Sequence, residues 1–527
     1  MSGAGFLELW RELPDSLGII SHIGTEPIQL TWTEAATVIS CLQERLHDCG
    51  VVNGTTVLLQ AACGQSELYS LLLLNALALN GCRVVFPMTP LEKHQQQWCD
   101  VLHYEVEISP LRMNIYEPAT SIAPSKVRTV SPAALVKNDL VTFIKDSLAG
   151  KLRNTSTPRH AGFDSKESLF ISTSGSSGEP KFISYDWDAF VASAKSWEAF
   201  GLFASDRFGG PGLTLLLAHT MGVRTWRNSL YCKQPFCLID PELFEAKPML
   251  AANLIAEMEL THLTGGPALF GSLLELARFA PSLNEDLSQS LQSVVMTGAP
   301  WSNQMAQQIR NAWGVAPRNA FGTTETQQVL VSQGASSMGG ELGAPLPGVK
   351  VHLDPVTESD FRLGFTSPFG GIKSYQYQGN VTPLFSPVFS GDLVTREQNG
   401  RLLFAHRAHS DFQKDSYGYK IQIDRVRKYL PELAKGHVEL EGMLDRPGLV
   451  LWAVVSKDDK QNESAKLQQW KEKANTVNRH LAIDLSQRDY QHYKIVRVAV
   501  LATDIPRTAK GSFNVIALRQ QLDSELH

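Results

Sequence analysis

The chain has 527 residues, of which 43% are hydrophobic and 19% are charged, and its formal net charge is −5. One hydrophobic core seldom extends over so many residues, so we expect two or more domains. The weak negative charge argues against nucleic acid or anionic lipid as a partner, and the longest apolar run, near 71–79, is too short to span a bilayer.

The cysteines and the amino terminus indicate a compartment. The seven cysteines are scattered, odd in number and without a Cys-x-x-Cys pair, which is typical of reduced, mostly buried thiols. The first ten residues lack the basic segment and the apolar segment of a secretory signal peptide. We therefore expect a cytoplasmic protein.

In chain order, helical and strand patterns alternate over roughly the first four hundred residues. The pattern predicts helices over 32–47, 66–79, 250–259, 270–278 and 302–313, and strands over 56–60, 82–86, 213–217 and 293–296. Such alternation is typical of an α/β fold. We expect a large amino-terminal domain of parallel or mixed sheets with flanking helices.

The pattern changes after Gly391. A β-ribbon near 400–405 is followed by a polar connection over 406–416, and then by a strand at 449–455, a charged helix at 463–480 and a strand at 495–501. We expect a large domain over 1–407 and a small, mobile α+β domain over 408–527.

The segment 173–181, with sequence TSGSSGEPK, is the most informative part of the chain and follows the apolar residues 169–171. Glycines let a backbone approach an anion closely, hydroxyl groups donate hydrogen bonds and a lysine adds positive charge. The segment therefore predicts a phosphate-binding loop. Its expected binding residues are Thr173, Ser174, Gly175, Ser176, Ser177, Gly178 and Lys181.

Three known loop types do not match this segment. Glu179 and Pro180 separate Gly178 from Lys181, which excludes a Walker A loop. The spacing of glycines excludes a Rossmann fingerprint, and the order of serines and glycines excludes a nucleophile elbow. A solvent-exposed Ser/Gly linker is the alternative that composition alone leaves open.

Further motifs follow the loop in a fixed order along the chain. They are Leu217–Gly222 around His219, Thr297–Pro300, Phe321–Glu325, Ser390–Asp392 and Arg407. In content, order and separation these segments resemble the adenylate-forming enzymes, which include acyl-CoA synthetases, aryl-acid ligases, adenylation domains of peptide synthetases and luciferases. The resemblance extends from about Thr31 to Arg519.

The resemblance implies a role for each motif. It places the backbone of Gly298, Ala299 and Pro300 and the ring of Phe321 against adenine. It gives Thr324 a contact with the α-phosphate or the substrate carboxylate, and it makes Glu325 a ligand of Mg²⁺, which prefers oxygen ligands.

Three further residues have implied roles. His219 is expected to line and gate the acyl pocket, Asp392 to accept the ribose hydroxyls, and Arg407 to contact the nucleotide. A buried core histidine remains open for His219, and a surface salt bridge remains open for Arg407.

The chain departs from the family pattern near its carboxyl end. The hinge segment 406–418 has drifted, with Asp411 as the candidate pivot and Gly418 as the candidate glycine of the thiol tunnel. Ser512 stands where the family carries its adenylation lysine, so we expect Lys510 to take over that role. A positive charge there stabilises the negative charge that develops on the α-phosphate.

The resemblance implies an ATP-dependent carboxylic acid ligase. The acid would form an acyl-adenylate with release of pyrophosphate, and then a thioester with CoA or with the phosphopantetheine of an acyl carrier protein. No carboxylate occurs in 218–226 to pair with an α-amine, which favours an acyl or aryl acid over an amino acid. A catalytically impaired nucleotide-binding homologue and a ligase with an amine or hydroxyl acceptor remain as alternatives.

Overall fold

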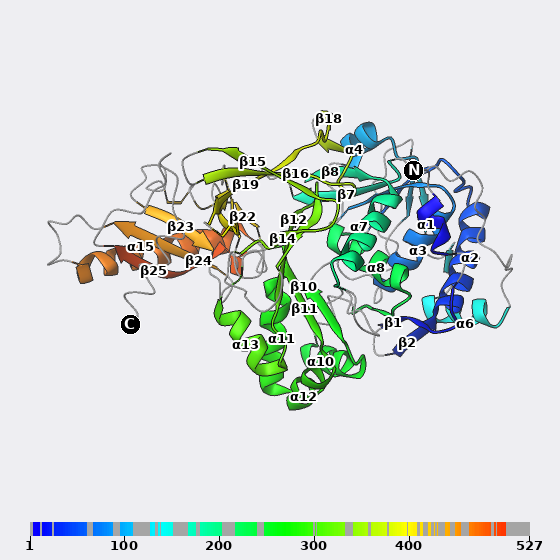
Figure 1. Cartoon of the computed structure of the whole chain (residues 1–527), viewed down its shortest axis with the longest axis horizontal. Helices are drawn as coiled ribbons and strands as arrows, with labels where there is room; N and C mark the ends of the chain where they lie inside the picture. Colours follow the sequence, from blue (N-terminus) through cyan, green and yellow to red (C-terminus); the bar gives the residue numbers. More distant parts are fainter. Residues whose placement is uncertain are drawn as a thin grey trace.

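A computed structural model of the chain describes most of its helices and strands (Figure 1). The residues it describes are 4–10, 13–23, 26–60, 67–87, 95–108, 127–131, 135–136, 139–150, 167–174, 180–202, 217–239, 247–298, 301, 303–332, 341–356, 360–376, 379–397, 399–407, 412–414, 420–422, 426, 429–430, 438–442, 448–454, 463–485, 490–491 and 493–501.

The largest sheet of the described residues has the strand order β18-β17-β8-β7-β4-β3-β5-β6. Its strands are β3 (Thr56–Leu59), β4 (Arg83–Phe86), β5 (Val106–Ile108), β6 (Arg128–Val130), β7 (Leu169–Ser174), β8 (Pro180–Tyr185), β17 (Lys373–Gln376) and β18 (Val381–Pro383). The strands from β7 to β6 are parallel, whereas β8, β17 and β18 add antiparallel neighbours. The sheet is therefore mixed.

Helices pack against this sheet for reasons visible in their sequences. The helix α2 (Trp32–Asp48) begins with a capping box, in which Thr31 and Glu34 each accept a hydrogen bond from the other's backbone. The helix α3 (Glu67–Leu79) is apolar on nearly all sides, and every one of its residues is buried. The remaining helices here are α1 (Ala4–Glu8), α4 (Gln95–Leu102), α6 (Leu140–Leu148), α7 (Trp187–Ala199) and α8 (Thr220–Cys232).

Two smaller sheets complete the α/β part. One contains β2 (Glu26–Thr31), β1 (Leu17–Ile23) and β9 (Phe236–Cys237). The other contains β10 (His262–Gly265), β11 (Ser293–Thr297), β12 (Arg318–Thr323), β13 (Gln327–Val331) and β14 (Ala344–Pro345), with helices α10 (Pro248–Glu257), α11 (Pro267–Phe279), α12 (Pro281–Ser290) and α13 (Asn303–Trp313). The strands β10, β11 and β12 are parallel, so their carboxyl ends share one edge.

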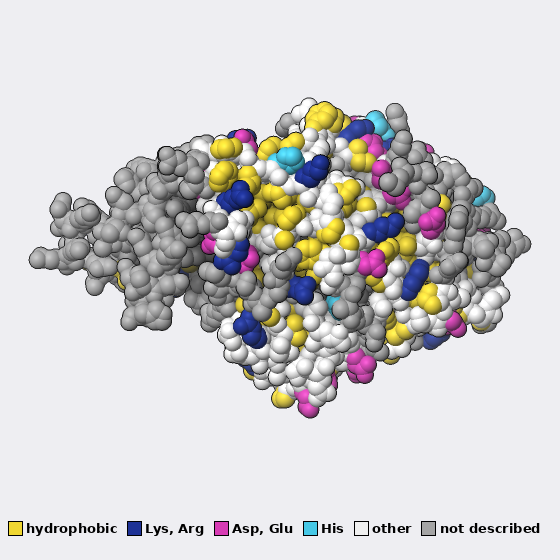
Figure 2. Space-filling view, in the orientation of Figure 1, with side chains coloured by type: hydrophobic (Ala, Val, Ile, Leu, Met, Phe, Trp, Pro, Cys, Tyr) yellow, Lys and Arg dark blue, Asp and Glu magenta, His cyan; other side chains and the backbone are white. Residues whose placement is uncertain are grey.

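A four-stranded antiparallel sheet adjoins these layers. Its strands are β15 (Lys350–Pro355), β16 (Asp360–Thr366), β19 (Val388–Arg396) and β20 (Leu402–Arg407). A β-bridge joins Glu341 to Leu403 in β20, and the Asn319 side chain of β12 donates a hydrogen bond to the Glu341 carbonyl. These contacts fix the antiparallel sheet beside β12. Figure 2 shows apolar side chains gathered over the centre of this face of the molecule.

The carboxyl-terminal part has a hydrophobic core of its own. The elements of this carboxyl-terminal part are β21 (Phe412–Lys414), β22 (Lys420–Gln422), β23 (Val438–Gly442), β24 (Leu449–Val454), α15 (Glu463–Asp484) and β25 (Ile495–Leu501). Leu451 and Val477 lie in this core, and the Asn478 side chain both accepts from and donates to the backbone of Ile495. Figure 1 shows this part at one end of the molecule.

The α/β class is confirmed, and the small mobile α+β domain stays a prediction. Each predicted helix has a counterpart, and so do the strands at 56–60, 82–86, 293–296, 449–455 and 495–501. The predicted strand over 213–217 lies outside the described residues except for Leu217, which is in a turn. The domain boundary at 407/408 stays a prediction.

Candidate functional site

The predicted phosphate loop joins two antiparallel strands. Thr173 in β7 pairs with Lys181 in β8, and Ser174 pairs with Pro180. Residues Gly175, Ser176, Ser177 and Gly178 lie outside the described residues. Because β17 pairs with the other side of β8, Lys181 projects from a strand held on both edges.

Lys181 contacts Glu325. The Lys181 Nζ lies 2.5 Å from Glu325 Oε1, and the two residues are 144 positions apart in the chain. The Lys181 side chain is 32% exposed and that of Glu325 is 18% exposed. The two strongest motifs of the sequence therefore meet in one partly buried ion pair.

The charge state of Glu325 follows from this pair. Burial raises the pKa of its carboxyl group, but the charge and hydrogen bond of Lys181, with smaller contributions from its own backbone and Thr323, outweigh burial. The net result is a pKa below the usual value. Glu325 is thus an anion at neutral pH, as a ligand of a divalent cation must be.

The turn that carries Thr324 and Glu325 is tightly held. The Thr326 hydroxyl accepts a hydrogen bond from the Thr323 amide and donates one to the Gln327 carbonyl. The amide of Gly371 donates to the Glu325 carbonyl at 2.8 Å. Gln327 has a positive φ of 57°. The turn between β12 and β13 is therefore fixed by contacts on both sides, and Thr324 is partly exposed on it.

Three strand ends converge near this turn. The parallel strands β10, β11 and β12 end at Gly265, Thr297 and Thr323. The side-chain amide of Gln328 donates a hydrogen bond to the Thr297 hydroxyl at 3.5 Å. In open α/β sheets, ligands bind at the carboxyl ends of strands. Gly298 follows β11 with a φ of 84°, whereas Ala299 and Pro300 lie outside the described residues.

His219 caps helix α8. Its Nδ1 accepts a hydrogen bond from the Met221 amide at 3.1 Å, so the proton of the neutral ring is on Nε2. The side chain is half-buried. The histidine therefore has a structural role at the helix amino terminus, and its predicted place in an acyl pocket remains untested.

The remaining predicted residues lie on neighbouring strands. Asp392 in β19 pairs with Arg407 in β20, and Asp392 is 2% exposed. The ring of Phe321 lies 6.1 Å from that of Phe365, at an angle of 42°. The structure thus brings Asp392 and Arg407 together. Lys510, Ser512, Asp411 and Gly418 lie outside the described residues.

Sequence reasoning missed two residues of this site. Tyr185 lies four positions after Lys181, on the same face of β8, and burial raises its pKa well above the usual value, with a further increase from Glu325. Thr326 organises the turn. The even spacing along the strand was a usable signal for Tyr185, because alternate residues of a strand share a face.

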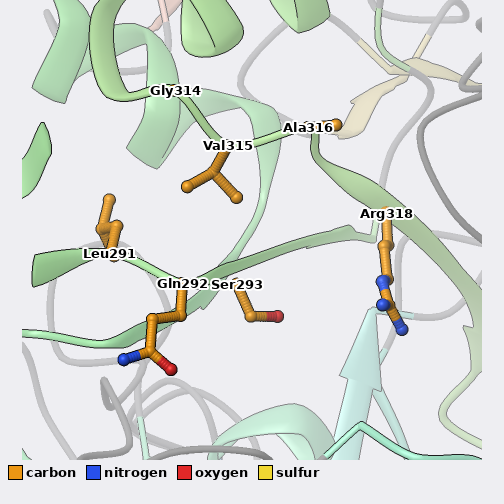
Figure 3. Close-up of a pocket in the computed structure, with 7 residues that line it drawn as sticks. All are labelled: Leu291, Gln292, Ser293, Gly314, Val315, Ala316 and Arg318. Atoms are coloured by element: carbon orange, nitrogen blue, oxygen red, sulfur yellow. The ribbon is translucent and has the colours of Figure 1, made fainter.

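A separate hollow of about 310 Å³ lies at the opposite end of two strands (Figure 3). It is lined by Leu291, Gln292, Ser293, Gly314, Val315, Ala316 and Arg318, which precede or begin β11 and β12. It contains none of the predicted site residues. Among the described residues, no group of three or more His, Cys, Asp or Glu side chains is arranged to hold a metal, and no helix is long and apolar enough to cross a membrane.

Comparison with known sequences identifies relatives. A family model described as AMP-binding enzyme matches residues 11–364. Gramicidin S synthase 2 of Brevibacillus brevis is 27% identical over 286 residues, which are 50% of this chain and 6% of that protein. Tyrocidine synthase 3 of Brevibacillus parabrevis is 25% identical over 281 residues, 49% of this chain and 4% of that protein. The chain thus spans a small fraction of the curated relatives it matches.

Solved structures share the fold over nearly the whole chain. A malonyl-CoA ligase in a ternary product complex with methylmalonyl-CoA and AMP is 18% identical, with a TM-score of 0.61 over 95% of this chain and 99% of that one. The o-succinylbenzoate CoA synthetase of Bacillus subtilis, in complex with its acyl-adenylate intermediate, is 17% identical, with a TM-score of 0.60 over 98% of this chain and 97% of that one. At this identity the likeness shows the fold.

Proposed function

We propose that this chain, which belongs to the family of AMP-binding enzymes, is an ATP-dependent ligase that activates an acyl or aryl carboxylic acid as its adenylate. The observation that carries the proposal is the contact between Lys181 and Glu325, which joins a glycine-rich loop to the carboxyl edge of a parallel sheet. On this proposal Lys181 binds phosphate and Glu325 binds the metal, and their contact supports it.

The proposed first step needs both charges. A carboxylate oxygen attacks the α-phosphorus of ATP, the new carboxyl-phosphate bond forms, and the bond to the pyrophosphate leaving group breaks. Negative charge grows on the α-phosphate oxygens during this attack. Lys181 and the Thr324 hydroxyl are the groups of this chain that stabilise that charge, and they act from strand β8 and the β12–β13 turn.

The residues present fit a Mg²⁺ ion shared with the nucleotide. Mg²⁺ in nucleotide sites is held by one or two carboxylates, with phosphate oxygens and waters completing the shell. Glu325 supplies an ionised carboxylate, in keeping with the lack of a larger ligand cluster among the described residues. The ion would neutralise the leaving phosphates. In the described state Lys181 is the cation that neutralises Glu325, so Mg-ATP binding must replace this contact.

The nucleotide is proposed to extend from Glu325 towards β19. Asp392 accepts the ribose hydroxyls, Arg407 contacts the nucleotide from the paired position, and Gly298 and Phe321 lie against adenine. The pairing of Asp392 with Arg407 supports this assignment. A carboxylate suits the role because it accepts two hydrogen bonds at once.

The second proposed step is transfer of the acyl group to a thiol, either that of CoA or that of a phosphopantetheine on an acyl carrier protein. The part after 407 would form a small domain that rotates between the two steps, since one cleft then serves two reactions. Lys510 is the proposed source of the missing lysine charge. We further propose a cytoplasmic location, which the buried thiols of Cys41, Cys82 and Cys237 support, because they form no disulfide.

One observation favours a second candidate function. Ser512 stands where an adenylation lysine is expected, so a nucleotide-binding homologue with impaired turnover is the alternative. Pyrophosphate release by the purified protein with Mg-ATP, hydroxylamine and a panel of acids separates the two. Acid-dependent release supports the ligase, and ATP binding without release from any acid supports the homologue. Acceptor trials with CoA, a carrier protein, amines and alcohols then identify the second step.

A further inference from the structure

Gln327 is buried in an unfavourable backbone conformation two residues after Glu325. It begins β13, is 1% exposed and has a φ of 57°. A positive φ is uncommon for a residue with a Cβ, and glycine and asparagine adopt it more readily than glutamine. Such a conformation persists only where the surrounding structure holds it in place. The contacts of Gln327 must therefore compensate for its backbone.

The Gln327 side chain makes one hydrogen bond to the described residues. Its Nε2 donates to the Phe369 carbonyl at 2.7 Å, although 42 positions separate the two residues in the chain. Its Oε1 is buried and accepts no hydrogen bond from the described residues. A buried amide oxygen without a partner is unfavourable, so packing alone does not account for a glutamine here. The property that distinguishes glutamine from an apolar residue at this position is the hydrogen bond to Phe369.

Phe369 belongs to the connecting segment 367–371, which joins β16 to β17. Phe369 is 0% exposed, so the segment is anchored in the interior. The amide of Gly371, at the other end of the segment, donates to the Glu325 carbonyl at 2.8 Å. The connecting segment therefore holds the turn between β12 and β13 at two points, through the Gln327 side chain and through the Glu325 backbone.

The connecting segment also contacts the strand that carries Lys181. Strand β17 follows the segment and pairs with β8, where Gln376 lies opposite Lys181. A Cβ at Gly371 would overlap the Ile183 side chain of β8 and would lie 3.5 Å from the Glu325 carbonyl. Strand β8, the connecting segment and the site turn are thus in close contact. The segment bridges the two sheets that carry Lys181 and Glu325.

We propose that Gln327 is a positioning residue of the nucleotide site: its bond to the connecting segment holds the Glu325 carboxylate in place for Mg-ATP. The inference rests on the proposed function, which assigns Mg-ATP to this site. Because Gln327 is buried inside the turn, it acts through Glu325 and not on the substrate itself. Groups that are held in place before the ligand arrives need no rearrangement when it binds.

The restraint from Gln327 matters most when Mg-ATP is bound. In the ligand-free protein the contact with Lys181 also fixes the Glu325 side chain. Mg-ATP replaces that contact, and the turn then depends on the bonds to the connecting segment. Residues that orient a metal ligand from behind typically change metal affinity when they are mutated. Loss of the Gln327 bond should therefore weaken binding of Mg-ATP more than binding of ATP without metal.

Two variants separate the hydrogen bond from the backbone conformation. Gln327→Leu keeps the approximate size of the side chain but leaves the Phe369 carbonyl without its donor. Gln327→Asn keeps an amide and adopts a positive φ more readily, but it is one methylene shorter, so its amide stops short of Phe369. We expect Gln327→Asn to melt close to the temperature of wild type. This variant tests positioning even if Gln327→Leu does not fold.

Gln43→Leu is the matched control. Gln43 is 4% exposed, its Nε2 donates to the Asn80 side chain at 2.9 Å, and its Oε1 also accepts no hydrogen bond from the described residues. Figure 1 shows helix α2, which carries Gln43, well apart from β12. The control therefore makes the same chemical change in a buried glutamine away from the site turn. It should alter stability without altering nucleotide binding.

The first measurement uses the protein without ligand. Urea unfolding of Lys181→Met, Glu325→Gln and the double variant gives the coupling between the two charges. The coupling should be largely lost when the same cycle is repeated with Gln327→Asn, because Glu325 is then no longer held against Lys181. It should equal the wild-type coupling with Gln43→Leu. An unchanged coupling with Gln327→Asn would overturn the inference.

The second measurement is titration of ATP in the presence of Mg²⁺ and in the presence of EDTA. Wild type should bind Mg-ATP more tightly, and both Gln327 variants should lose about tenfold in affinity for Mg-ATP and much less for metal-free ATP. Variants that keep the full preference for Mg-ATP would overturn the role of Gln327. A wild type without that preference would overturn the metal role of Glu325 and this inference with it. Tight Mg-ATP binding without pyrophosphate release from any acid would overturn the ligase alone.

Discussion

The Lys181 ammonium group lies 2.5 Å from the Glu325 carboxylate, although 144 positions separate the two residues in the chain. The strand β8 carries the lysine at the edge of a glycine-rich hairpin, and the β12–β13 turn carries the glutamate at the carboxyl edge of a second sheet. The ion pair therefore joins the two sheets. When Mg-ATP binds, its charges would replace the contact between Lys181 and Glu325.

Loss of either charge of this pair should impair adenylation. Lys181→Met and Glu325→Gln are each expected to lower acid-dependent pyrophosphate release about 100-fold or more, since each removes one stabilising charge from the transition state. The double variant should lose less than the product of the single effects, because the residues act as one unit. Steady-state kinetics of the three variants measures this.

Lys373→Met is the matched control for that experiment. Lys373 also forms an ion pair, 2.7 Å from Glu167, and it lies on β17, next to β8, with 38% of its side chain exposed. Exposed pairs contribute little to stability. The activity of Lys373→Met should equal that of wild type. A loss as large as that of Lys181→Met would show that any change in this sheet impairs the enzyme.

The stability of the free protein should depend on pH through Glu325. Its pKa is below the usual value of 4.5 in the folded state, so ionised Glu325 stabilises the fold above that value. The contribution is lost as pH falls through the folded pKa. The free energy of unfolding of wild type relative to Glu325→Gln should be constant above about pH 5.5 and should decrease below pH 4.5. Urea unfolding across pH measures it, and a difference that grows on acidification contradicts the assigned direction.

The proposed ribose role of Asp392 predicts a substrate-dependent effect. Asp392→Asn should weaken ATP binding by about tenfold, since a charged acceptor is replaced by a neutral one. The same change should have much less effect on 2′-deoxy-ATP, which has already lost one of the two hydroxyls. Titration of both nucleotides against both proteins measures the coupling. Equal weakening of the two nucleotides would place Asp392 away from the ribose.

Two glycines should respond to alanine in opposite ways. A Cβ at Gly322 would overlap the backbone carbonyl of Gln327 inside the site turn, so Gly322→Ala should destabilise the protein by about 3 kcal/mol and reduce activity. A Cβ at Gly271, within helix α11, would lie 3.8 Å from Met305, an ordinary contact, so Gly271→Ala should stabilise it by about 0.5 kcal/mol. Thermal unfolding of both variants tests the turn geometry.

Local patterns made much of the fold predictable. The spacing of apolar residues predicted α2, and the continuous apolar run predicted α3, because both are formed by contacts near in sequence. The pairing of β17 with β8 could not be predicted from the sequence. Lys373 pairs with Ser184, which lies far away along the chain, and no local signal specifies such a partner. The mixed character of the large sheet follows from that pairing.

The candidate site was predictable by motif but not by environment. Lys181 and Glu325 were identified from their sequence motifs, whereas their contact depends on how two sheets pack. The sequence pattern did not distinguish Arg224 and Arg227, because a helix with arginine, threonine and asparagine is typical of a protein surface. Burial of that helix is a property of the tertiary structure, and no local pattern specifies it.

The central claim is that the chain adenylates a carboxylic acid, and the most direct measurement is pyrophosphate release with Mg-ATP and hydroxylamine in the presence of single acids. The account predicts release that depends on an acid, saturates with it and falls about 100-fold or more in Lys181→Met. Bound ATP with no release from any acid, or release that Lys181→Met leaves unchanged, would contradict it.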